Sequence, residues 1–216
     1  IEITHICAPI GRGVRPAKRY PIDTLWVGDY IKRIDRIRFV RRSELLALTG
    51  ITPARFGNIF HRGQLPFGDP NAERQGWADY SLDEAVQLAL MLRLMELDWP
   101  IERATAAVRE HFELLVSERD RKKPARRDLH FGVAIETLYL PADWSVSVDW
   151  VVHGFAGTLA ELDDGMEDPS ITEISGMVLV NASATVRRMI HTGRAKGAKP
   201  ETLEKLRRRW RIRVDV

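Results

Sequence analysis

The chain has 216 residues, of which 44% are hydrophobic, so it can bury a core without help from a disulfide or a metal ion. Its one cysteine, Cys7, excludes an internal disulfide and a cysteine metal cluster, and it indicates a reducing compartment, so we expect a cytoplasmic protein. No apolar run approaches the roughly 20 residues of a membrane-spanning helix, and we therefore expect no membrane partner.

The net charge of +3 conceals an uneven distribution along the chain. Residues 12–42 contain ten Lys or Arg and three Asp or Glu, and residues 187–213 contain eleven and two. Residues 43–186, in contrast, contain twelve basic and 23 acidic residues. The basic ends are typical of contact with a polyanion such as nucleic acid, although solvated surface segments have the same composition.

Residues 1–39 form a basic N-terminal segment, in which glycine and proline interrupt any regular pattern. The spacing of isoleucines in residues 27–40 predicts an amphipathic helix, although residues 38–40 also fit a strand. The stretch "RRSELLALTG" predicts a short helix with Ser43 as N-cap and Gly50 at its end.

A second short helix is predicted in "ITPARFGNIFHRG". Thr52 is a suitable N-cap, Pro53 suits the first helical position, and Gly63 ends the helix. Gly57 inside it costs roughly 1 kcal/mol of helix propensity relative to alanine, which indicates close packing or a close approach on that face. The spacing of three apolar residues predicts one buried stripe, made of Phe56, Ile59 and Phe60.

Two longer helices follow a loop or loose hairpin over residues 64–80. "SLDEAVQLALMLRLMELDW" begins with a capping box of Ser81 and Glu84. "IERATAAVREHFELLVSERDRKK" has an apolar face from Ile101 to Val116, which we expect to pair antiparallel with a second copy in a homodimer. A linker is predicted over residues 118–128.

The pattern changes after this linker. "LHFGVAIETLYL" and "WSVSVDWVVHG" are β-branched, aromatic and partly alternating, which predicts strands. "ITEISGMVLVNASATVRRMIHTG" fits a strand or short helix followed by a helix to His191, and "PETLEKLRRRW" predicts a final helix.

The two short helices joined by Gly50–Thr52 predict a helix-turn-helix, whose second helix enters the major groove of DNA, with the following loop as a wing. The segment from Arg42 to about Val108 resembles the winged helix-turn-helix of the MerR superfamily, including its excisionase-like variants. The pieces that carry this resemblance are "SELLALTGITPA", "HRGQLP" and "YSLDEAVQLALMLRLMELDWPIERA". The expected fold is therefore α+β: a winged helix-turn-helix with its following helices over residues 40–118, and a smaller mixed α/β C-terminal domain with a basic tail over residues 129–216.

The resemblance implies sequence-specific binding of double-stranded DNA, usually as a homodimer and usually in transcription control. MerR-type regulators carry arginine and tyrosine in the middle of the recognition helix, where this chain has Gly57, Asn58 and Ile59; an asparagine there suits the excisionase-like version. The lack of further cysteines speaks against the metal-sensing branch.

Seven residues are predicted to contact DNA. Arg55 and Asn58 lie one turn apart and suit guanine and adenine, because their side chains form paired hydrogen bonds with those bases. Thr52 both caps the helix and faces a phosphate. Phosphate contacts are expected from the remaining four, which are Arg41, Arg42, Arg62 and Arg74. The alternative is a solvated helix with ordinary capping residues.

No catalytic, metal or nucleotide-binding motif occurs, so we expect neither an enzyme nor a cofactor. In the C-terminal region we consider a site for a small-molecule or protein effector lined by Trp144, Trp150 and Phe155, against the alternative that these residues are core. The tail "LRRRWRIRV" either contacts phosphates with stacking by Trp210 or docks on an acidic neighbour, including the acidic middle of this chain.

The sequence thus predicts a sequence-specific DNA-binding protein, a MerR-like transcriptional regulator. One alternative is an excisionase of a mobile element or a DNA-packaging recognition protein. Another is a protein-interaction module whose winged helix no longer binds DNA.

Overall fold

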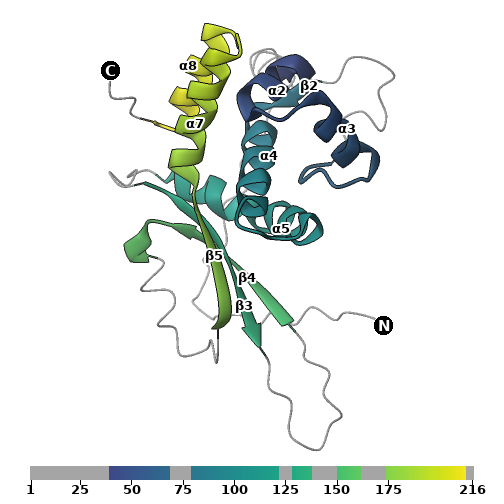
Figure 1. The fold of residues 1–216 in the computed structure, drawn as a ribbon. Coiled ribbons are helices and arrows are strands. Elements are labelled where there is room, and N and C mark those ends of the chain that lie inside the picture. Colours follow the sequence, from purple (N-terminus) through teal and green to yellow (C-terminus); the bar gives the residue numbers. More distant parts are fainter. Residues whose placement is uncertain (1–38, 69–78, 122–127, 138–149, 162–173, 213–216) are drawn as a thin grey trace, which may run out of the picture. The chain divides into compact units, whose positions relative to one another are not determined.

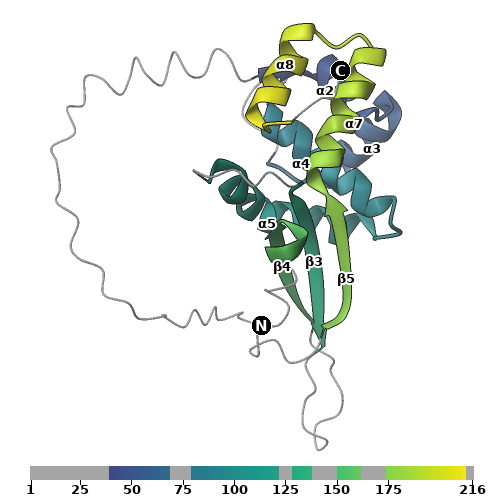
Figure 2. The ribbon, with the colours of Figure 1, turned by 90° about the vertical axis from the view of Figure 1, so that its left-hand side faces the viewer.

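The computed structural model describes residues 39–68, 79–121, 128–137, 150–161 and 174–212. The chain divides into two compact units, residues 1–37 and 38–216, and all described residues belong to the second. This unit combines helices with two small antiparallel sheets (Figures 1 and 2), which confirms the predicted α+β class.

A pair of short helices follows the first strand. β1 (Phe39–Arg41) pairs antiparallel with β2 (Asp79–Ser81), and α2 (Arg42–Thr49) and α3 (Pro53–His61) lie between them in the chain. Gly50 ends α2 with φ 74°, a left-handed conformation that favours glycine. The prediction of Ser43 as N-cap is wrong: β1 leads directly into the helix, and Arg41 is the N-cap without a side-chain bond.

α4 (Leu82–Met95) is the central helix of the unit. It begins with the predicted capping box, in which the Glu84 amide donates to the Ser81 hydroxyl at 3.0 Å and the Ser81 amide donates to the Glu84 carboxylate. Most of its side chains are buried, on all sides of the helix, as expected where neighbours surround it.

α5 (Ile101–Asp120) packs against α4 and the larger sheet. Its buried residues include Ala104, Val108, Phe112 and Leu115, the face expected to pair with a second copy. That expectation is wrong for this surface, because elements of the same chain cover it.

The larger sheet has the strand order β4-β3-β5 and is antiparallel throughout. Its strands are β3 (His130–Thr137), β4 (Trp150–Gly157) and β5 (Ile174–Asn181). β3 and β4 confirm the two predicted strands within the described residues, and β5 is a strand where a strand or a short helix was expected. His111 of α5 packs directly on Gly154 of β4. Burial lowers the pKa of the His111 imidazole, and nearby His153 lowers it further, against the opposing influence of Glu110.

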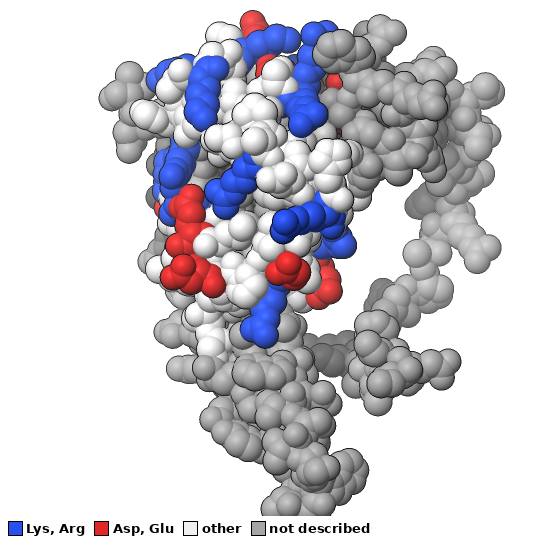
Figure 3. Space-filling view, turned by 45° about the vertical axis from the view of Figure 1, so that its right-hand side comes forward, with Lys and Arg blue, Asp and Glu red and all other residues white. Residues whose placement is uncertain are grey.

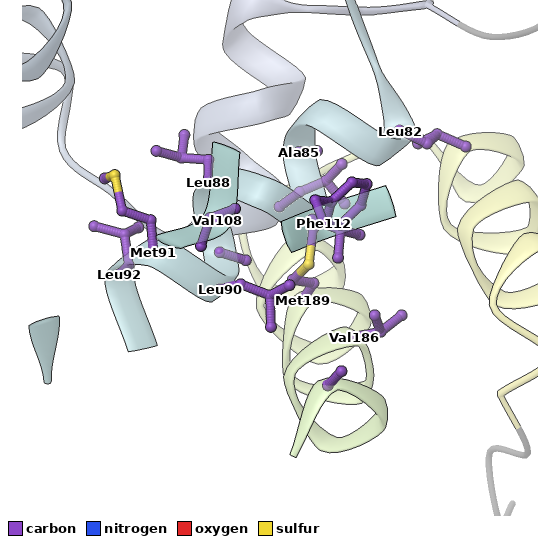
Figure 4. Packing of buried hydrophobic residues seen from close by; sticks show 14 of the residues in the cluster. Leu82, Ala85, Leu88, Leu90, Met91, Leu92, Val108, Phe112, Val186 and Met189 are labelled. Carbon is purple, nitrogen blue, oxygen red and sulfur yellow. The ribbon is translucent and has the colours of Figure 1, made fainter. Parts of the chain in front are cut away.

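α7 (Ala182–Ala195) follows β5 without a break, and α8 (Pro200–Arg209) follows α7, as predicted. Asn181 caps α7, accepting a hydrogen bond from the Ala184 amide at 2.7 Å. α7 packs on α2 and α4, so helices from both sides of the predicted linker share one hydrophobic core. Figure 4 shows side chains from α4, α5 and α7 meeting there, among them Leu90, Phe112 and Met189.

None of the helices in the described ranges is both long and apolar enough to cross a membrane.

Candidate nucleic-acid interface

The helix α3 is held in place by its cap and its apolar stripe. The Thr52 hydroxyl accepts a hydrogen bond from the Arg55 amide at 3.3 Å, and Pro53 occupies the first helical position, as predicted. Phe56 and Ile59 are buried. The buried side chains therefore hold α3 in one orientation, and the residues on its other side face solvent.

The opposite side of α3 presents polar side chains to solvent. Arg55 and Asn58 are both exposed, one turn apart. Within the described part of the chain, neither side chain makes a hydrogen bond or an ion pair. Their donors and acceptors are thus available to a partner.

Other predicted contact residues surround this surface. Arg41, Arg42, Thr52 and Arg62 are all exposed, and Arg74 lies outside the described residues. The Arg42 guanidinium lies 5.1 Å from the centroid of the Phe56 ring, close enough for a cation–π contact. The N-terminal end of α2 is in this way tied to the buried face of α3.

Gly57 lies in the middle of α3, between buried Phe56 and exposed Asn58 in the sequence, and is itself half-buried. A Cβ atom added there would meet nothing within 4 Å, so the predicted close packing inside the chain is absent among the described residues. Among the described residues, nothing requires glycine at this position.

Basic side chains are widespread on this side of the molecule. Figure 3 brings forward the side on which α3 lies in Figure 1. Lys and Arg side chains spread from its upper end over the middle, whereas most Asp and Glu side chains gather lower down. Among the described residues, the upper and middle parts of this face are therefore richer in basic than in acidic side chains.

A cavity of about 270 Å³ adjoins the first turn of α3, between the α2–α3 turn, α4 and α7. Its charged lining residues are four cations and one carboxylate, namely Arg55, Arg93, Arg188, Lys196 and Glu96. Arg188 is 59% exposed and approaches Glu96 at 3.3 Å, and Arg93 also pairs with Glu96. The Lys196 ammonium donates to the Gly50 carbonyl at 2.9 Å.

No family model matches the chain, and no curated protein matches it.

Some of the basic side chains in residues 187–213 pair with carboxylates of the same chain, and others are exposed. Arg209 donates to Asp83 of α4, at 2.7 Å from its Nε, and this hydrogen bond raises the pKa of the guanidinium. Hydrogen bonds from Arg207 and Arg208 lower the pKa of the Glu204 carboxyl to about 2. Trp210 is buried, so of the two alternatives for this tail, docking on the chain's own acidic middle is the one observed for Arg209 and Trp210.

The aromatic residues considered for an effector site are only partly described. Trp144 lies outside the described residues, and Trp150 and Phe155 belong to β4. Among the described residues, no group of three or more His, Cys, Asp or Glu side chains is arranged to hold a metal ion.

The structure adds three cations that were not singled out from the sequence: Arg93, Arg188 and Lys196. The only signal for two of them is the excess of Lys and Arg in residues 187–213. The composition of this run does not show which of its basic residues line the cavity, as Arg188 and Lys196 do, and which pair with a carboxylate of the same chain, as Arg209 does.

Proposed function

We propose that this protein binds double-stranded DNA in a sequence-specific manner through α3, as a MerR-like transcriptional regulator. One observation carries the proposal: Arg55 and Asn58 are exposed and unpaired within the described residues, on a helix whose other side is anchored in the core. These two side chains suit guanine and adenine edges, and the major groove of B-DNA admits one helix.

The pairing of β1 with β2 supports a winged arrangement. It joins the segment before α2 to the segment before α4, with α2 and α3 between the two paired strands in the chain. A wing placed there would contact the DNA backbone beside the recognition helix.

The charge around α3 supports the same proposal. Exposed Arg41, Arg42 and Arg62 are suited to phosphates, which supply much of the affinity of protein–DNA complexes. Such contacts position the protein, and the sequence preference then depends on α3.

The test is selection of binding sites from random duplex DNA, with the native protein and with the double variant Arg55→Ala/Asn58→Ala. We expect an enriched motif with the native protein and its loss in the variant, because each paired base contact contributes about 1–3 kcal/mol of discrimination. An inverted repeat in the motif would indicate a homodimer on DNA.

The matched control is Arg208→Ala, which removes an exposed arginine of α8 that belongs neither to α3 nor to the cavity lining. It should keep the motif. Salt-sensitive binding without any motif would instead support an excisionase or DNA-packaging role, and absence of binding would support a protein-interaction module.

A further inference from the structure

The cavity beside α3 has an excess of positive charge that its own residues do not balance. Glu96 is the one carboxylate among its described lining residues, and it is shared by Arg93 and Arg188. Arg55 and Lys196 have no carboxylate partner within the described part of the chain. An anion entering the cavity would therefore meet uncompensated cations.

Donors also remain free in this cavity. Lys196 uses its ammonium to bond the Gly50 carbonyl, and an ammonium carries three N–H donors. Arg188 makes one contact to Glu96, and a guanidinium carries five N–H donors. Both side chains can bind an oxyanion without giving up the contacts they already make.

The position of α7 relative to the α2–α3 turn is held by packing. A Cβ atom at Gly50 would lie 3.2 Å from the Thr192 side chain, so the turn and α7 are in close contact. The Lys196 bond to Gly50 joins the same two elements. The cations of α7 are in this way held at a set position beside the start of α3.

The location of the cavity points to one kind of anion. Arg55 belongs both to its wall and to the first turn of α3. DNA bound to α3 would bring a backbone phosphate alongside the edge of the groove, and Lys and Arg side chains are the usual phosphate contacts.

We propose that Arg188 of α7 and Lys196, which directly follows α7, hold with Arg93 of α4 a backbone phosphate of the DNA bound by α3. The inference rests on the proposed function. It assigns the C-terminal helices a direct part in DNA binding, beyond their part in the core. Because phosphates carry no sequence information, these residues contribute affinity and not sequence preference.

The test compares Arg188→Gln/Lys196→Gln with the matched control Lys199→Gln/Lys205→Gln. Both variants lower the net charge by the same amount, and Lys199 and Lys205 are exposed residues outside the cavity. Affinities are measured for the selected site and for a scrambled duplex, from about 50 to about 200 mM salt.

We expect the cavity variant to lose affinity by the same factor for both duplexes, with the selected motif unchanged. The slope of log affinity against log salt should fall in magnitude by about 1, since one phosphate contact contributes about 0.9. The control should keep the native slope. The charge-conserving variant Arg188→Lys/Lys196→Arg should also keep it, which separates lost charge from lost folding.

A cavity variant with the slope and affinity of the control would overturn this inference. If the native motif still depended on Arg55 and Asn58 in that case, the proposed function would stand without it. Native protein that bound no DNA would overturn both. A changed motif in the cavity variant would also overturn the inference, because it would mean that these residues read bases.

Discussion

Gly57 lies within the proposed recognition helix α3, where a glycine lowers helix stability. Its neighbours Phe56 and Asn58 face the core and solvent, respectively, and a side chain at Gly57 would meet no atom of the described chain within 4 Å. Glycine within a helix costs stability relative to alanine, and nothing within the described residues compensates for that cost. A partner that approaches the backbone closely would account for it.

We therefore expect Gly57→Ala to raise the free energy of unfolding by about 0.5–1 kcal/mol, because alanine favours the helix and restricts the unfolded chain. The same variant should bind the selected DNA more weakly than the native protein. Urea denaturation and a duplex titration measure the two effects. Unchanged affinity would show that the glycine does not serve close approach of DNA.

The contact between α5 and β4 determines how the long helix lies on the sheet. His111 fills the space above Gly154, where a Cβ atom would come within 2.1 Å of the imidazole. Since that distance is far below any van der Waals contact, a side chain at this position would force the helix or the strand to move.

Gly154→Ala should consequently lower the free energy of unfolding by about 1–3 kcal/mol, the usual cost of overpacking a tight contact. The matched control is Gly176→Ala on β5, where a Cβ atom would meet nothing within 4 Å. Urea denaturation of both variants gives the comparison. Equal effects of the two substitutions would contradict this description of the helix–sheet contact.

Asp83 joins three helices of the unit. From α4 it accepts hydrogen bonds from Arg119 of α5 at 2.9 Å and from Arg209 at the end of α8 at 2.7 Å. The Arg119 side chain is only 3% exposed, and its guanidinium lies 5.0 Å from the centroid of the Trp210 ring. The acidic middle of the chain thus neutralises part of its basic end.

Asp83→Asn should lower the free energy of unfolding by on the order of 2 kcal/mol, because it leaves buried Arg119 with less of its charge compensated. Asp120→Asn is the control: Asp120 also pairs with Arg119, but its side chain is 60% exposed, so a smaller loss is expected. Thermal and urea unfolding measure both. A loss at Asp120 equal to that at Asp83 would rule out a special role for the buried pair.

The starts and ends of several helices were predictable from the sequence, because they depend on interactions between residues close together in the chain. Thr52 and Pro53 start α3, Gly50 ends α2, and Ser81 with Glu84 starts α4, all through bonds that span only a few residues. The prediction for Ser43 failed because the pairing of β1 with β2, which is distant along the chain, determines where α2 begins.

The candidate site was predictable only in part, for the same reason. The residue pattern of α3 was enough to predict that Phe56 is buried and that Arg55 and Asn58 are exposed, since the helical repeat turns the two polar residues away from Phe56. The position of Lys196 beside the α2–α3 turn, and the pairing of Arg209 with Asp83, depend instead on how distant helices pack. Both are basic residues of one run, and the packing of α7 and α8 on α2 and α4 gives them different surroundings that no local pattern encodes.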